Sequence, residues 1–272
     1  MKALIYTEWL KMRKYNAFWW IMGITTLSYP GINFIFHFVY QQIVQQQSQT
    51  GQMAKILLGN PFSFPEAWHT VAYFSSWFVF IPAVVVIMLI TNEYGFKTHR
   101  QNIIDGWSRN QFLSSKLIDV MLITLIITLL YSVISFVTGN LNQERLIKST
   151  WEQVHYVGLF ALQTFSQLSL AFFIGFLVRK AFIALGIFIF YFFPFEPIIV
   201  ALLKEYGNDS GRFLPLEISD RLIPRPAFLA KLDEAGYKES LNAIPQHVLY
   251  TLLLTGVVWG VCFWVNKRRD LK

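Results

Sequence analysis

NEYGFKTHRQNIIDGWSRNQFLSSK, residues 92–116, is a charged island between two long apolar runs. The runs before and after it are each about 20 residues long, enough to cross the hydrocarbon core of a bilayer as a helix. The island should therefore be a short loop that leaves the membrane between two spanning helices.

The composition of the whole chain supports a membrane protein. Of its 272 residues, 54% are hydrophobic and only 14% are charged, whereas a soluble domain normally carries about 25% charged residues. The formal net charge of +7 is explained by basic residues on the cytoplasmic side of a bilayer. We therefore expect a lipid bilayer, and no nucleic acid, as the partner of these charges.

Apolar runs predict an all-α protein with six transmembrane helices in one domain covering residues 1–272. Residues 1–16 fit a helix lying in the membrane interface with Trp9 as its anchor, or else a solvated basic leader. The first run is too long for a signal peptide, and Pro30 predicts a kink or break in it. The spans are expected at about 17–40, 73–91, 117–138, 155–178, 181–203 and 245–265. The Gln-rich segment within 41–72 is expected to be partly disordered.

Charge counting sets the orientation. The leader, the island, the turn at 179–180 and the C-terminal tail hold 14 of the 23 lysines and arginines. Because basic residues accumulate on the inner side, both termini and the island are predicted to be cytoplasmic. The polar segment 204–244 is then extracytoplasmic.

The island carries signals for a short helix that ends at a corner. Thr98 followed by Gln101 fits a capping box, which predicts a helix start at Thr98. Gly106 can adopt the left-handed conformation that ends a helix. We expect a helix of about seven residues followed by a turn at Gly106.

A second helix start follows directly. Ser108 and Gln111 form another capping box, and Trp107 and Phe112 occupy the positions of a hydrophobic staple. A helix as short as the first one is not stable alone. It must either dock on a partner or pack against its own spans or lipid.

The island resembles the intracellular loop of ABC-2 type transporter permeases, in particular those of bacterial bacitracin- or lantibiotic-export systems. That loop shows a Glu, a Gly and Thr, then a Ser-Arg pair after a Pro or Gly, and a Lys at the foot of the third span. The matching residues are Glu93, Gly95, Thr98, Arg100, Gly106, Ser108, Arg109 and Lys116, with Glu8 and Lys11 matching a Glu-Lys pair ahead of the first span. One departure is that Phe96 and Lys97 separate Gly95 from Thr98.

This resemblance implies that the short helix is a coupling helix seated in a groove of a separate ATP-binding subunit. The resemblance also implies two copies of that subunit, a second permease chain (identical or paralogous), and a multi-pass location in the bacterial plasma membrane. ATP and magnesium would belong to the partner subunit, since this chain has no G-x-x-x-x-G-K-[ST] loop. The expected docking residues are Glu93, Thr98, Arg100, Asn102, Ile103, Ile104, Asp105, Gly106 and Arg109.

Catalytic and metal-binding patterns are absent from the sequence. The five histidines form no H-E-x-x-H motif and the single cysteine, Cys262, has no partner for a disulfide. We therefore expect no catalytic residue, metal or cofactor on this chain. A non-transporting assembly or sensor protein stays open as an alternative, and a membrane-embedded enzyme is the other.

Glu196 is the notable acid within an apolar run, since it lies between Pro194 and Pro197 near the outer end of the fifth span. Two prolines interrupt a helix and free backbone groups. Either Glu196 and its prolines shape an outer gate, because ionisable residues at such depth are often functional, or Glu196 reaches interfacial water.

Small polar residues also follow the third and fourth spans at helical spacing, among them Thr128, Ser132, Gln163 and Gln167. They either hold helices together or line a transport pathway. The chain has no dense charged pathway, which favours export of an amphipathic or hydrophobic substrate such as a peptide, drug or lipid-like molecule.

Overall fold

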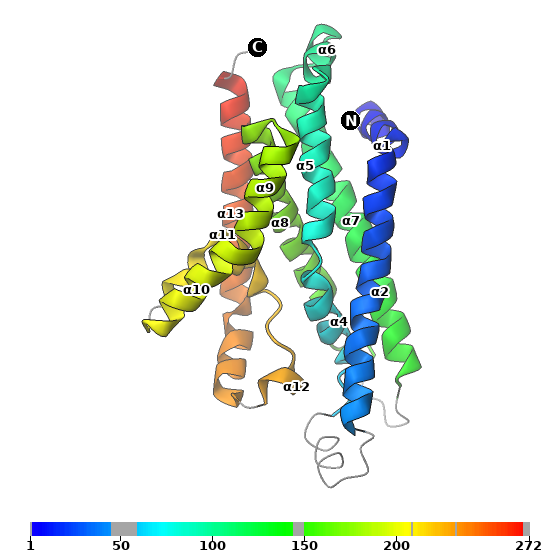
Figure 1. Ribbon diagram of the computed structural model, residues 1–272, viewed down its shortest axis with the longest axis vertical. Helices are drawn as coiled ribbons and strands as arrows, with labels where there is room; N and C mark the ends of the chain where they lie inside the picture. The colour runs from blue at the N-terminus through cyan, green and yellow to red at the C-terminus, as the bar shows by residue number, and fades with distance from the viewer. Residues whose placement is uncertain (1, 45–58, 144–149, 208, 232, 269–272) are drawn as a thin grey trace.

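The computed structural model describes residues 2–44, 59–143, 150–207, 209–231 and 233–268, with residues 2–5 described by backbone alone. Every regular element in these ranges is a helix, and the helices form one elongated bundle (Figure 1). The predicted disorder within 41–72 falls largely on residues 45–58, which lie outside the described residues.

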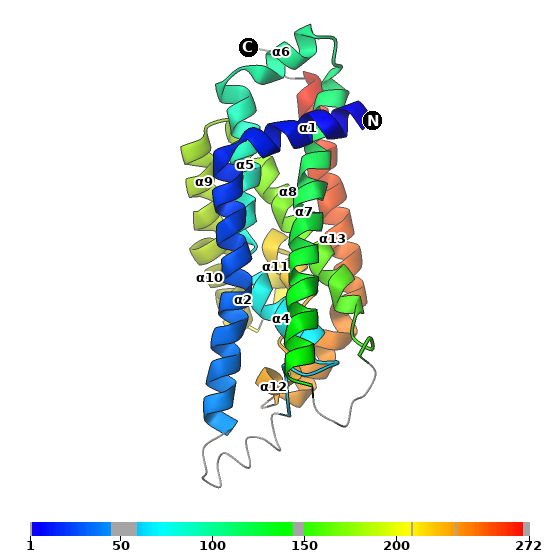
Figure 2. The ribbon, with the colours of Figure 1, turned by 90° about the vertical axis from the view of Figure 1, so that its right-hand side faces the viewer.

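The N-terminal helix lies across one end of the bundle. α1 spans Lys2–Lys14 and crosses that end, and after Tyr15 the chain turns into α2, Asn16–Val44, which runs along the bundle (Figure 2). α2 continues through Pro30 as one helix. Of the predicted kink or break at Pro30, the break is wrong, because a proline removes one helical hydrogen bond while the turns on either side remain bonded; the kink stays a prediction.

The second predicted span is bent. α4, Ala67–Ser76, and α5, Phe80–Gly95, meet at an angle of 50° across a short break. The predicted range 73–91 covers the end of α4, the break and most of α5, and the bend was not predicted from the sequence.

Two long helices follow the island. α6, Thr98–Ile104, is the short helix of the island, and α7 runs from Arg109 to Leu141. α8 spans His155–Val178, as predicted for the fourth span, and α9 spans Ala181–Phe190. α5 and α8 make the most extensive packing, with α7 and α13 also packed on α8.

The fifth predicted span contains a change of helix type. The α-helical pattern gives way to a π-helical turn at Tyr191–Phe195, and then resumes as α10, Glu196–Glu205. Pro194 lies in the π turn and Pro197 in the first turn of α10, so the prolines do interrupt the helix.

The segment between the fifth and sixth predicted spans is largely helical. It contains a 3-10 turn at Asp209–Phe213, α11 at Pro215–Asp220 and α12 at Ala227–Ala230. The last helix, α13, spans Glu234–Arg268 and continues through Pro245. The predicted sixth span, 245–265, lies within this helix, which begins eleven residues before 245, so the last part of the predicted 204–244 segment is helical as well.

Among the described residues, four helices are long and apolar enough to cross a membrane, namely α7, α8, the helix from Ala181 to Glu205, and α13; the bent pair α4–α5 makes a fifth. α2 has 29 residues but is not among them. Six spans and the orientation of the termini therefore stay predictions. The buried core joins α2, α5, α7, α8 and α13, with Tyr29, Tyr131, Phe160 and Phe172 among its largest side chains.

Candidate functional site

The short helix α6 lies beyond the end of the bundle, near α1 and the C-terminal end of α13 (Figures 1 and 2). Lys97 precedes it with φ of +57° and Gly106 follows it with φ of +98°. A Cβ at Gly106 would meet nothing within 4 Å, so the positive φ, and not crowding, favours glycine there. The predicted short helix and its glycine corner are confirmed.

The first predicted capping box is wrong. Lys97, not Thr98, is the residue that precedes α6. The Thr98 hydroxyl instead donates to Oε2 of Glu93 at 2.6 Å, and the Gln101 amide donates to Asp105 at 2.9 Å. A hydrogen bond from a hydroxyl to a carboxylate is charge-assisted, and it holds the Thr98 side chain on Glu93.

The second capping box is confirmed. Ser108 Oγ accepts from the Gln111 amide at 3.1 Å, and the Ser108 amide donates to Gln111 Oε1 at 2.8 Å. This box starts α7 directly after the corner, so the helix of the predicted third span extends out to the island. The staple between Trp107 and Phe112 stays a prediction.

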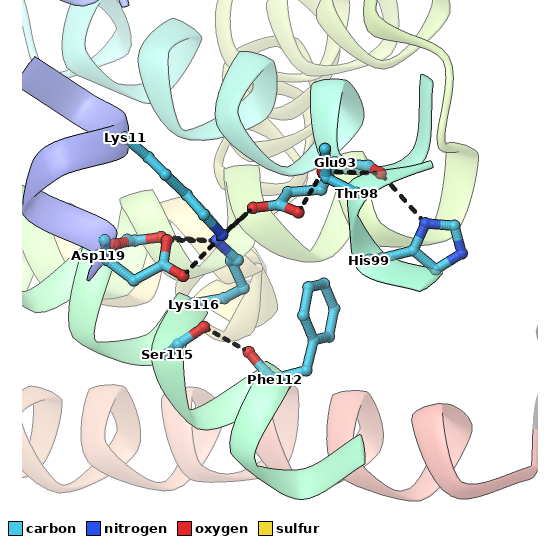
Figure 3. Close-up of polar contacts among 9 residues, drawn as sticks. Lys11, Glu93, Thr98, His99, Phe112, Ser115, Lys116 and Asp119 are labelled. Atoms are coloured by element: carbon cyan, nitrogen blue, oxygen red, sulfur yellow. Dashed lines mark hydrogen bonds and ion pairs between the residues drawn. The ribbon is translucent and has the colours of Figure 1, made fainter. Parts of the chain in front are cut away.

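Below α6 lies a buried cluster of charged residues, which we call the charge cluster: Glu8, Lys11, Glu93, Lys116 and Asp119 (Figure 3). The Lys116 ammonium lies 2.5 Å from Glu8, 2.9 Å from Glu93 and 3.1 Å from Asp119. An ammonium has three N–H donors, so each donor of Lys116 has its own carboxylate. The cluster thereby joins α1, α5 and α7.

Lys11 supplies the second cation at the edge of the charge cluster. It lies 3.1 Å from Glu8 and 2.9 Å from Glu93, and its ammonium is 5.8 Å from the centre of the Trp107 ring. Burial raises the pKa of the Glu8 carboxyl, but Lys116 and Lys11 more than offset this and hold its pKa below the usual value. Glu8 is therefore charged at neutral pH and ties α1 to the bundle.

Glu93 connects the charge cluster to α6. Its Oε1 receives both lysines, while its Oε2 receives the Thr98 hydroxyl. The backbone carbonyl of Glu93 is also bonded to the His99 ring at 3.1 Å. One residue at the end of α5 thus holds α1, α7 and the first turn of α6 together.

The surface around α6 contains exposed apolar side chains. Ile104 and Phe96 are each 77% exposed at this end of the bundle. Asp105 is exposed, and Arg100, Asn102 and Ile103 are half-buried. Apolar side chains exposed to water beside polar ones are typical of a surface that a partner covers.

Arg109 has a different position from the one expected of a residue that faces a partner. Its guanidinium donates to the backbone carbonyls of Asn266 and Lys267 at 3.3 and 3.0 Å, and the Asn266 amide donates to the Arg109 carbonyl. Arg109 therefore joins the start of α7 to the C-terminal end of α13.

These features agree with a comparison to known families. A family model described as ABC-2 family transporter protein matches residues 4–195, more than half of the chain. The chain belongs to the ABC-2 transporter family. No curated protein matches the chain significantly. An ABC-2 permease is the membrane component of a transporter, so the chain is a transport protein and is not itself expected to be an enzyme. Permeases of this family normally work with an ATP-binding subunit.

The assembly of the charge cluster was not predicted from the sequence. Glu8, Lys11, Glu93 and Lys116 were named separately for the family resemblance, but nothing in their spacing indicated that they meet. Asp119 was missed as a site residue, although a carboxylate three residues after Lys116 on one helix face was a usable signal.

Glu196 is buried, with 2% of its surface exposed, and does not reach solvent. Its Oε1 accepts from the backbone amides of Leu216 and Glu217 at 2.7 and 2.6 Å. Glu196, the first residue of α10, thus caps the start of α11.

The polar residues of α7 and α8 behave differently from each other. Ser132 donates to the Thr128 carbonyl within its own helix. Gln163 and Gln167 instead donate across to Asp220 at the end of α11, at 2.8 and 2.7 Å. Within the described residues, no group of three or more His, Cys, Asp and Glu side chains is arranged to hold a metal ion.

Proposed function

We propose that this chain is the permease subunit of an ABC exporter and that α6 is the element through which a separate ATP-binding subunit drives it. The observation that carries the proposal is the position of α6. It lies outside the bundle, exposes Ile104, follows the exposed Phe96 closely in the chain, and is tied through Glu93 to α1, α5 and α7.

The proposed docking residues around α6 are Thr98, Arg100, Asn102, Ile103, Ile104, Asp105 and Gly106, which are exposed or half-buried, together with Glu93, which is buried and supports them from below. Ile104 and Phe96 enter the groove of the ATP-binding subunit, and Arg100 and Asp105 contribute polar contacts at its rim. Arg109 acts indirectly, because its contacts with α13 fix the corner that presents α6.

The charge cluster transmits the motion. Closure of the ATP-binding subunits displaces α6, and Glu93 passes the displacement to α7 through Lys116 and to α1 through Lys11. A buried ion network favours one arrangement of its groups over intermediate ones, because separating the charges in a low-dielectric interior is costly. The three helices should therefore move as one unit.

The working unit contains two ATP-binding subunits and a second permease chain, identical or paralogous, in the bacterial plasma membrane. ATP and magnesium are held by the partner subunits. The substrate is amphipathic or hydrophobic, since the helices that are long enough to cross a membrane are mostly apolar. Glu196 and the π turn form part of the outer gate, so a Glu196→Leu variant that is folded should lose export from cells.

Co-purification tests the docking. The chain, tagged at its C-terminus and extracted in mild detergent, should bring down a protein with a Walker A motif, identified by mass spectrometry. Ile104→Glu should reduce the recovered ATP-binding subunit at least tenfold, because a charge would be buried in the groove. Leu229→Glu on α12, which changes another exposed aliphatic residue, is the matched control and should retain the partner.

Two outcomes would contradict the proposal. Equal recovery of the ATP-binding subunit with Ile104→Glu would remove α6 from the docking surface. Recovery of other membrane proteins but no ATP-binding subunit would favour the assembly or sensor alternative.

A further inference from the structure

Asp220, the last residue of α11, lies against the middle of a spanning helix. Both of its partners, Gln163 and Gln167, are on α8, which begins at His155. At 1.5 Å per residue, they lie roughly 12 and 18 Å along α8 from its start. A carboxylate from the segment after α10 is thus held against the middle of α8, while Asp220 as a whole residue keeps part of its surface exposed.

The group formed by Asp220, Gln163 and Gln167 has more hydrogen-bond acceptors than donors. Gln163 and Gln167 are almost fully buried and both donate to the same oxygen, Oδ1 of Asp220. Their own amide oxygens have no hydrogen-bond partner within the described residues. Turning either amide over would place its oxygen against the carboxylate, so the surplus of acceptors cannot be removed by rotation.

Among the described residues, no lysine, arginine or histidine forms an ion pair with Asp220. Arg221 follows it in sequence, but that guanidinium pairs with Asp209 at 2.6 Å and with Glu217 at 2.7 Å. Arg225 interacts with the phenol of Tyr73, and Glu196 and Glu217 add further negative charge around Asp220. Asp220 takes part in none of the ion pairs found within the described parts of the chain.

We propose that Asp220, with Gln163 and Gln167, is a substrate-binding site for an ammonium or guanidinium group. A protonated amine would supply both the missing charge, to the carboxylate, and the missing N–H donors, to the amide oxygens. One carboxylate flanked by two amides is a poor site for a divalent metal, which prefers more anionic oxygen ligands. The inference rests on the proposed function and specifies the substrate as a cationic amphiphile.

Binding to the permease alone tests this site without any ATP-binding subunit. The purified full chain, in nanodiscs of zwitterionic lipid, is titrated with dansyl-labelled dodecylammonium and, separately, with the uncharged acetylated form of the same probe. The wild type should bind the ammonium probe at least tenfold more tightly. Asp220→Asn, which keeps an oxygen acceptor for both glutamines, should abolish that preference.

Matched controls isolate the charge at this position. Glu205→Gln removes an exposed carboxylate from the same part of the chain and should keep the preference, and Asp220→Glu should restore part of it. An equal affinity of the wild type for both probes would overturn the site, as would a tenfold preference that survives Asp220→Asn. The comparison of the two probes on the wild type tests the site even if a variant does not fold. Failure of the wild-type chain to recover an ATP-binding subunit in the co-purification would contradict the proposed docking at α6 and not this site.

Discussion

Lys116 is the residue on which the end of the bundle near α6 depends. Its side chain is 3% exposed, and its ammonium is bonded to carboxylates from α1, α5 and α7. Three acids and two bases share the charge cluster, so Lys116 cannot be removed without leaving buried negative charge. The cost of breaking such a buried network by deleting one partner is about 3–5 kcal/mol.

Lys116→Met should therefore destabilise the protein strongly. We expect the free energy of unfolding to fall by about 3–5 kcal/mol, because Glu8, Glu93 and Asp119 lose their shared cation. Thermal unfolding in detergent, followed by the fluorescence of the nine tryptophans, measures the change. Lys180→Met, at an exposed lysine, is the control and should shift the melting temperature little.

A double-mutant cycle shows whether the loss comes from the ion network. Glu8→Gln combined with Lys116→Met should be less damaging than the sum of the two single changes, since Glu8→Gln removes one of the three negative charges that lose their shared cation in Lys116→Met. Strict additivity would show that the cluster contributes through packing alone.

At the scale of elements, the corner at Gly106 decides where α6 points. Its φ of +98° is rarely adopted by residues with a side chain. The Ser108 capping box then starts α7, so the direction of α6 relative to α7 is set within three residues of sequence.

Gly106→Ala should change the presentation of α6. We expect a cost of about 1 kcal/mol or more and weaker recovery of the ATP-binding subunit, because alanine disfavours the positive φ. Gly95→Ala is a close control, since both sites have open space for a Cβ but Gly95 has no positive φ. Equal effects of the two substitutions on melting temperature and partner recovery would show that the corner is not strained by a side chain.

At the scale of the whole molecule, α1, α6 and the C-terminal end of α13 lie at one end of the bundle (Figure 2). Their basic residues predict that this end faces the cytoplasm. The charge cluster and Arg109 hold these segments together, so the parts nearest the proposed ATP-binding subunit form one connected surface.

Cysteine labelling tests this orientation. In a Cys262→Ser background, Lys97→Cys should react with a membrane-impermeant maleimide only after the cells are opened, whereas Glu205→Cys should react in intact cells. Both residues are exposed and Cys262 is buried, so the reagent should report sidedness and not burial. Labelling of Lys97→Cys in intact cells would reverse the assignment.

The sequence determined the features that depend on neighbouring residues. Apolar runs predicted the helical class, and Gly106 with Ser108 and Gln111 predicted the corner and the start of α7, because such signals act within one or two turns. The Thr98 capping box failed because Glu93, held in place by two lysines, is a stronger partner for its hydroxyl. Local patterns cannot show such a competitor when its strength comes from residues far along the chain.

Tertiary structure alone decided which distant charges meet. Glu8 and Lys116 are 108 residues apart, and Gln167 and Asp220 are 53 apart, so no periodicity could pair them. Burial selects these contacts, because a charge or amide removed from water must find a partner wherever the packed helices provide one. Local sequence therefore determines the helices and the short helix of the island. The packing of α1, α5 and α7 determines that this short helix is joined to all three through the charge cluster.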